Sequence, residues 1–129
     1  TLDPCAGETD GDDNLVLSED GLSRSWRTTP GGLVFVNPPY GRALPNWIEK
    51  ASMEGARGIE VLLLIPARPA DAWHDHIFPK AQAICFWRKR IWFEGAIAGA
   101  PFPSALVYFG LRVTAFKVAL SKYGRVVVL

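Results

Sequence analysis

The chain alternates short apolar runs with longer amphipathic stretches, a pattern that indicates strands separated by helices. The apolar runs are rich in β-branched and aromatic residues, which favour an extended backbone. Residues 61–65 are apolar at every position, which is typical of a strand covered on both faces of a sheet. The predicted strands are residues 32–37, 60–66, 82–87, 104–109 and 125–129, and residues 1–3 are the expected end of a further strand.

Three stretches between the predicted strands have the spacing of amphipathic helices. Residues 45–57 carry an apolar stripe that includes Trp47 and Ile48. Gly58 follows this stripe as a helix stop. The other two predicted helices are residues 71–78 and 112–122. Strands that alternate with helices predict an α/β fold with a mostly parallel sheet flanked by helices, in which the closely spaced later strands leave room for antiparallel pairing at one edge.

Length and composition fit one folded domain. The chain has 129 residues, of which 49% are hydrophobic, so we expect a single domain over residues 1–129 with one core. Charged residues make up 21% of the chain, which excludes the disordered and fibrous classes. The first residue is Thr1 and not Met, so we expect the domain to be truncated at its N-terminus.

The sequence contains no feature that would direct the chain to a membrane or out of the cell. No apolar stretch reaches the roughly 18 residues of a membrane helix, and the start of the chain is acidic, where a signal peptide is basic. Cys5 and Cys85 stand far apart without metal-ligating neighbours, which is typical of reduced thiols. We therefore expect a cytoplasmic protein that binds no metal. The oligomeric state stays open.

Charge is distributed unevenly along the chain. Residues 1–20 carry seven acidic residues and no Lys or Arg, whereas residues 21–129 carry six acidic and 14 basic residues. Such an asymmetry is typical of a body that binds a polyanion and has an acidic rim. An ordinary basic surface beside a solvated acidic loop explains the same charges equally well.

The sequence Asn37-Pro38-Pro39-Tyr40-Gly41 directly follows a predicted strand, where open parallel sheets bind their ligands. The amide oxygen of Asn37 and the carbonyl of Pro38 can accept the two hydrogens of an exocyclic amine, which frees the nitrogen lone pair for attack on a methyl group. Two prolines stiffen the loop, so these acceptors are set in advance. Tyr40 supplies a ring on which a base flipped out of a duplex can stack. The alternative interpretation is a Pro-Pro turn capped by Asn, in which Tyr40 only packs.

Asn-Pro-Pro-Tyr resembles the catalytic signature of amino-methyltransferases that use S-adenosyl-L-methionine. The chain as a whole is similar to the phage-type DNA N6-adenine methyltransferases. The other segments that carry this resemblance are residues 2–6, residues 20–22 with Trp26, Trp47, residues 64–68 with Asp71 and Trp73, and residues 100–107. The resemblance implies a Rossmann-like methyltransferase domain, DNA as partner, S-adenosyl-L-methionine as cofactor, and the cytoplasm of a bacterial or phage-infected cell as location. The implied catalytic residues are Asn37, Pro38, Pro39 and Tyr40.

The chain departs from the family pattern in two places. Family members have a segment with a Trp and a Thr-Pro pair before the first of these blocks, and the present sequence lacks it. Residues 88–90 read Arg-Lys-Arg where the family tends to have Gly-Arg. The first departure puts the activity of a chain of this length in question, and the second concerns the expected DNA contacts.

Two segments are expected to hold the cofactor. By the resemblance, the loop that begins at residues 3–7 cradles the methionine end of S-adenosyl-L-methionine, and its glycines let the backbone approach the cofactor closely. Asp20 is the candidate to bind the ribose or the adenine of the cofactor, because a carboxylate accepts hydrogen bonds from either group. Asp20 is equally well explained as part of a turn. The expected cofactor-binding residues are Asp3, Pro4, Cys5, Ala6, Gly7 and Asp20.

Basic side chains near the predicted site are the candidates for DNA contact. Residues 86–93 interleave aromatic and basic side chains, which is typical of a nucleic-acid surface. An amphipathic strand pair with a solvated basic tip has the same composition, and in that interpretation Trp87 and Trp92 are core residues. Trp73 also fits a packing position. Two histidines, His74 and His76, lack a third ligand for a metal. The expected DNA-binding residues are Arg42, Arg68, Arg88, Lys89 and Arg90.

Taken together, the sequence predicts transfer of a methyl group from S-adenosyl-L-methionine to the N6 amine of adenine in DNA, with the base flipped out of the duplex. Two alternatives stay open. One is an amino-methyltransferase that acts on cytosine N4 or on a glutamine amide in proteins. The other is a non-catalytic nucleic-acid-binding module on a methyltransferase fold, which S-adenosyl-L-methionine would not stabilise.

Overall fold

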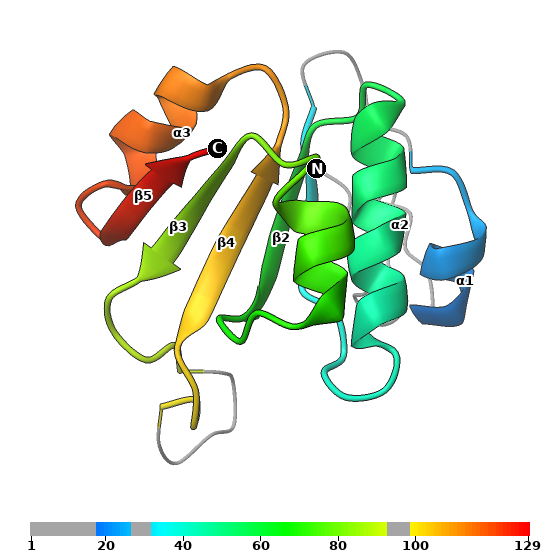
Figure 1. The fold of residues 1–129 in the computed structure, drawn as a ribbon, viewed down its shortest axis with the longest axis horizontal. Helices are drawn as coiled ribbons and strands as arrows, with labels where there is room; N and C mark the ends of the chain where they lie inside the picture. Colours follow the sequence, from blue (N-terminus) through cyan, green and yellow to red (C-terminus); the bar gives the residue numbers. More distant parts are fainter. Residues whose placement is uncertain (1–17, 27–31, 93–98) are drawn as a thin grey trace.

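The computed structural model describes residues 18–26, 32–92 and 99–129. These residues form a five-stranded sheet with helices on both sides (Figure 1). The strands are β1 (Val34–Val36), β2 (Val61–Pro66), β3 (Ala83–Trp87), β4 (Ser104–Phe109) and β5 (Gly124–Val128). The helices are α1 (Ser18–Ser23), α2 (Leu44–Ala56) and α3 (Val113–Leu120), together with the π-helical turn η1 (Trp73–Ile77). The mixed α/β fold class is therefore as predicted.

The sheet is mixed, so the prediction of a mostly parallel sheet is wrong. The strand order is β1-β2-β4-β3-β5, and only the pair of β1 with β2 is parallel among the described strands. β4 runs antiparallel to both of its neighbours, β2 and β3, and β5 runs antiparallel to β3. The antiparallel pairing therefore runs from the centre of the sheet to its β5 edge, and is not confined to that edge. A strand that is buried on both faces carries the same apolar pattern in either direction, which is why the sequence did not reveal it.

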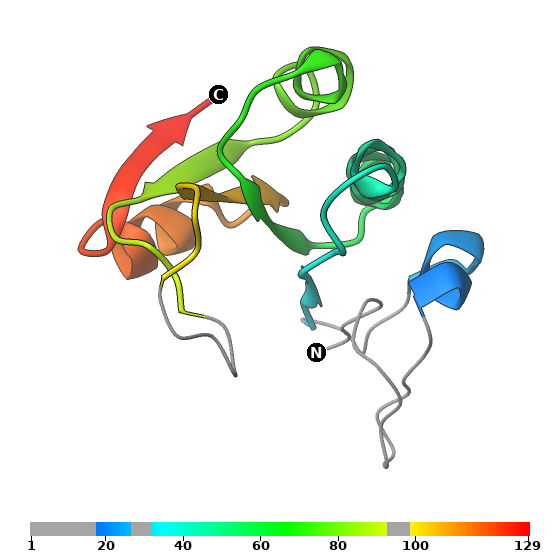
Figure 2. The ribbon, with the colours of Figure 1, turned by 90° about the horizontal axis from the view of Figure 1, so that it is seen from below.

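Two apolar clusters cover the two faces of the sheet. α2 and η1 lie on one side and α3 on the other, as Figure 2 shows edge-on. The first face buries Val34, Leu63 and Val107 against Trp47 of α2 and Trp73 of η1. The second face packs Leu106 and Tyr108 of β4 against Phe116 of α3. Alternate residues of β2 and β4 enter opposite clusters because successive strand side chains point to opposite faces.

The pairing directions bring several chain segments to one edge of the sheet. β3 runs in the same direction as β1 and β2, because it is antiparallel to β4, which is antiparallel to β2. The carboxyl ends of β1, β2 and β3 therefore share one edge with the first residues of β4 and β5. We call this the carboxyl edge. It carries the loops that follow Val36, Pro66 and Trp87.

None of the helices in the described part of the chain is long and apolar enough to cross a membrane.

Candidate active site at the carboxyl edge

The loop after β1 holds the predicted catalytic residues. Pro38 is buried, Asn37 and Tyr40 are partly buried, and Pro39 is exposed. The Tyr40 hydroxyl donates a hydrogen bond to Oδ1 of Asn37 at 3.3 Å. Burial raises the pKa of Tyr40 to about 12, so the phenol keeps its proton and remains a donor at neutral pH. Because an amide oxygen has two lone pairs, Asn37 Oδ1 can accept one further hydrogen bond.

Gly41 ends this loop with a backbone that a side chain would strain. Its φ is +119°, a region that residues with a Cβ rarely adopt. The N–H of Leu44 donates to the Gly41 carbonyl at 3.1 Å, so the turn leads directly into α2. Pro45 occupies the first turn of that helix, where a missing N–H costs nothing. The loop is thus held between β1 and α2.

An aromatic residue from a distant segment contacts the loop. Phe102 lies two residues before β4, and its ring meets the Tyr40 ring edge-on, with centroids 5.3 Å apart and an angle of 75° between the planes. The Arg68 guanidinium lies over the Phe102 ring, with Cζ 5.0 Å from the centroid. The loops after β1 and β2 and the approach to β4 therefore meet at the carboxyl edge. Phe102 was not among the predicted site residues. Its signals in the sequence were its place between two prolines and inside residues 100–107, one of the segments that carry the family resemblance.

A groove of about 690 Å³ opens beside this loop, between α2 and the segment that contains η1. Gly41, Arg68 and Asp71 line it, together with Glu49 of α2 and His76 of η1. Nε2 of His76 is 3.5 Å from a Glu49 carboxylate oxygen, and its buried Nδ1 has no hydrogen-bond partner among the described residues. No group of three His, Cys, Asp or Glu side chains in the described part of the chain could hold a metal ion. Trp73 is 2% exposed and is a core residue.

The basic residues predicted to contact DNA are exposed, but they are spread along the edge. Arg42 lies in the turn before α2, and Arg68 follows β2. The tip residues Arg88, Lys89 and Arg90 follow β3, which is three strand positions from β1 in the sheet. Trp87 is partly buried and stacks on Tyr123, with centroids 5.1 Å apart and 8° between the planes. The structure therefore brings Arg68 to the loop after β1 and puts the tip at the other end of the same edge.

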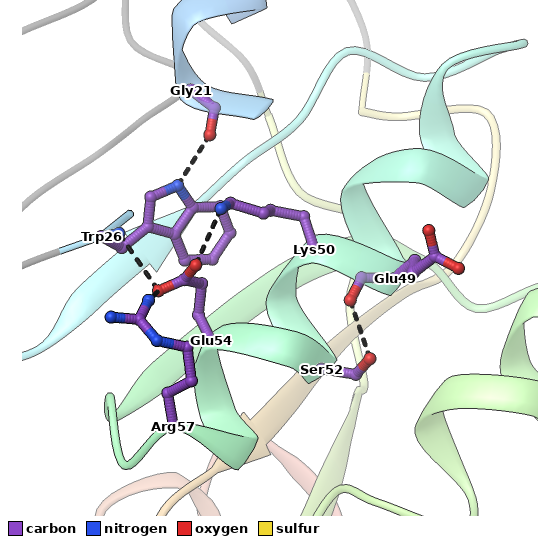
Figure 3. Close-up of polar contacts among 7 residues, drawn as sticks. All are labelled: Gly21, Trp26, Glu49, Lys50, Ser52, Glu54 and Arg57. Atoms are coloured by element: carbon purple, nitrogen blue, oxygen red, sulfur yellow. Dashed lines mark hydrogen bonds and ion pairs between the residues drawn. The ribbon is translucent and has the colours of Figure 1, made fainter. Parts of the chain in front are cut away.

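Of the predicted cofactor-binding residues, Asp3, Pro4, Cys5, Ala6 and Gly7 lie outside the described residues, and Asp20 is described only as a position in α1. The chain that follows α1 is attached to α2 by a buried carboxylate, Glu54 (Figure 3). The Trp26 N–H donates to Glu54 Oε1 at 3.1 Å, and the Trp26 indole N–H donates to the Gly21 carbonyl at 2.8 Å. Lys50 Nζ is 2.7 Å from Glu54 Oε2, and Arg57 also pairs with this carboxylate. Glu54 was not among the predicted site residues, and the basic residues at i−4 and i+3 were the available signal for it.

The described groups at the loop after β1 fit a cofactor with a positively charged sulfur. Aromatic faces attract cations, and an amide oxygen is a suitable polar neighbour for an electropositive methyl group. Tyr40 and Asn37 supply these groups within one contact network. The neutral phenol of Tyr40 adds no competing charge.

Comparison with protein families gives a match that covers most of the chain. Residues 2–104 match the family model described as DNA N-6-adenine-methyltransferase (Dam). Comparisons with curated proteins and with solved structures find no match. The matched range includes the loop after β1, Arg68, the basic tip and Phe102, and it ends at the first residue of β4.

Proposed function

Because the chain belongs to the DNA N-6-adenine-methyltransferase (Dam) family, we propose that it transfers a methyl group from S-adenosyl-L-methionine to the N6 amine of adenine in DNA. The observation that carries the proposal is the contact network at the end of β1. There Tyr40 donates to the side-chain oxygen of Asn37 and packs against Phe102, while the residues around this network come from three separate loops.

In this proposal Asn37 and Pro38 bind the target amine. Asn37 Oδ1 and the Pro38 carbonyl accept the two amine hydrogens, and this favours a nitrogen whose lone pair is free. The Tyr40 hydroxyl keeps Oδ1 of Asn37 in place, because its hydrogen bond opposes rotation of the amide. Pro38 and Pro39 restrict the loop, so the acceptors need little rearrangement when the reaction occurs.

The adenine ring is proposed to stack on Tyr40, whose ring is packed edge-on against Phe102. Bound S-adenosyl-L-methionine supplies the electrophilic methyl group. Asp3, Pro4, Cys5, Ala6, Gly7 and Asp20 stay the proposed cofactor-binding residues. Arg42, Arg68 and the basic tip are proposed to contact DNA phosphates. A single domain over residues 1–129 and a cytoplasmic location also stay predictions.

The test is methyl transfer from isotope-labelled S-adenosyl-L-methionine to mixed-sequence DNA, followed by digestion and mass spectrometry of the nucleosides. Label in N6-methyladenine is the expected result. Label in N4-methylcytosine instead would show that cytosine, and not adenine, is the substrate. Asn37→Ala is expected to lower turnover at least about 100-fold, since it removes one oriented polar contact to the reacting group. Thr114→Ala, on the exposed part of α3, is the control. Full activity of Asn37→Ala at an unchanged melting temperature would contradict the assignment.

A further inference from the structure

We propose that Arg88, Lys122 and Arg125 form a pocket that binds a backbone phosphate of the DNA, at the end of the carboxyl edge opposite the catalytic loop. The proposal deepens the proposed function and rests on DNA being the substrate. It adds Lys122 and Arg125 to the expected contacts. Both residues lie beyond the range that matches the family model.

The pocket forms where three segments meet at the carboxyl edge. It has a volume of about 410 Å³ and is lined by Phe86, Arg88, Ser121, Lys122, Gly124 and Arg125. Arg88 follows β3, and Ser121 and Lys122 follow α3. Arg125 is the second residue of β5, which pairs with β3. Three cationic side chains from different segments thus surround one hollow.

Backbone pairing holds these segments together. Phe86 pairs with Arg125 and Trp87 pairs with Gly124 across the antiparallel strands. The ladder continues past β3, because the Arg88 N–H donates to the Tyr123 carbonyl at 3.0 Å. Opposite residues of an antiparallel pair share a face, so Arg125 projects from the same face as Phe86. The positions of the Arg88 and Arg125 backbones are therefore fixed relative to each other.

Close packing beneath the pocket further restricts the turn that connects α3 with β5. A Cβ on Gly124 would lie 2.1 Å from the Phe86 carbonyl oxygen, so the two strands approach closely only because residue 124 is glycine. On the α3 side, Trp87 stacks on Tyr123, and Lys122 Nζ is 5.2 Å from the centre of the Tyr123 ring. The pocket is thus supported by ordered neighbours and does not depend on flexible side chains alone.

The charge of the pocket is not balanced by carboxylates. Within the described residues, none of Arg88, Lys122 and Arg125 pairs with an acidic side chain. Residues 80–129 contain eight Lys and Arg residues and a single acidic residue, Glu94. Three unpaired cations around a hollow attract an anion, and Arg recognises phosphate oxygens with paired donors.

The position of the pocket favours a phosphate of a long polyanion over a free phosphate. Strands are spaced by about 4.8 Å, so β3 and β5 lie about 14 and 19 Å from β1 across the sheet. Arg68 lies between, at the end of β2. In duplex DNA one base pair occupies about 3.4 Å of the axis, so this span corresponds to about four to six base pairs. When the target base of a DNA strand is bound at the catalytic loop, a phosphate of the same DNA can therefore reach the pocket along this edge.

The test compares DNA affinity across salt concentrations, without S-adenosyl-L-methionine. Each phosphate contact contributes about 0.9 to the slope of log affinity against log salt. Fluorescence anisotropy with a labelled duplex is expected to give a slope about 0.9 smaller for the double variant Lys122→Ala/Arg125→Ala than for the unchanged chain, because one phosphate contact is lost. Between 50 and 200 mM salt, the unchanged chain is then expected to lose about 3.5-fold more affinity than the double variant. Lys80→Ala removes an exposed charge just before β3, at the opposite edge of the sheet, and is expected to leave the slope unchanged.

The outcomes separate this proposal from the proposed function. An equal slope for the double variant and the unchanged chain, at matched melting temperatures, overturns the pocket even when adenine is methylated. A reduced slope in a chain that methylates no base supports the pocket and rejects the proposed reaction. Complete release of DNA by millimolar inorganic phosphate at constant ionic strength, or no DNA binding by the unchanged chain, also overturns the pocket.

Discussion

Removal of the Glu54 carboxylate is expected to destabilise the protein more than the loss of an ordinary surface ion pair. Glu54 lies on α2 with only 2% of its surface exposed, and it accepts the Trp26 N–H, which is buried in the same cluster. Glu54→Ala leaves this N–H without its acceptor and Lys50 without its partner. The side chain of Lys50 is only 14% exposed, so water replaces the lost contact incompletely.

The contacts of Glu54 contribute different amounts to the free energy of unfolding. An unsatisfied buried N–H costs about 1–3 kcal/mol, and removal of one partner of a fully buried ion pair costs about 3–5 kcal/mol. The Arg57 side chain is 51% exposed, so its pairing contributes little. Because Lys50 keeps some access to water, its ion pair contributes less than a fully buried one, and we expect a total loss of about 3 kcal/mol, below the sum of the two values. For a chain of this size that corresponds to a fall in Tm of about 12 °C.

Thermal unfolding followed by circular dichroism measures this change, and two further variants sharpen it. Glu54→Gln keeps an oxygen for the Trp26 N–H and loses the charge, so its Tm is expected between those of Glu54→Ala and the unchanged chain. Glu49→Ala is the matched control on the same helix, because the Glu49 side chain is 55% exposed. Its effect is expected to stay below about 0.5 kcal/mol. A Tm of Glu54→Ala within about 2 °C of the Glu49→Ala value would refute the reasoning.

Two predictions concern titration. Tyr40→Phe is expected to remove a phenol that ionises near pH 12 in ultraviolet titration, because burial raises the pKa of Tyr40 to about 12; loss of a transition near pH 10 would contradict this. The Arg112 hydrogen bond lowers the pKa of Glu60 below 4.5, so the charged carboxylate stabilises the fold above that pH, and this stabilisation disappears as the pH falls through the lowered pKa. Glu60→Gln is therefore expected to cost more stability in urea at pH 7 than at pH 3, and an equal cost at both would count against it.

The positions of the strands and of the later helices could be read from the sequence, because apolar patterns record burial directly, whereas α1 was not predicted. The prediction of residues 104–109 as a strand matches β4, and residues 60–66 differ from β2 by one position. The predicted helix 71–78 became a π-helical turn, in which Trp73 and Ile77 are both buried. Strand direction was not readable, because β2 and β4 are covered on both faces and their patterns fit parallel and antiparallel neighbours alike.

The candidate site was predictable to the extent that it is continuous in sequence. Asn37 and Tyr40 are three residues apart, so one loop brings them together. Phe102 reaches Tyr40 only through the pairing of β4 with β2, and Glu54 reaches Trp26 across 28 residues. Lys122 and Arg125 join Arg88 through the register of β5 on β3. Such contacts depend on tertiary pairing, which local composition does not encode.

The central place of β4 has a consequence for the order of folding during synthesis. β2 and β3 precede β4 in the chain but do not pair with each other, because β4 lies between them. A nascent chain that ends before residue 104 therefore exposes two apolar strands with unpaired edges, which are prone to self-association. The sheet can close only after β4 has left the ribosome. For the same reason, residues 2–104 would not form this sheet when expressed alone, although they contain the predicted catalytic loop.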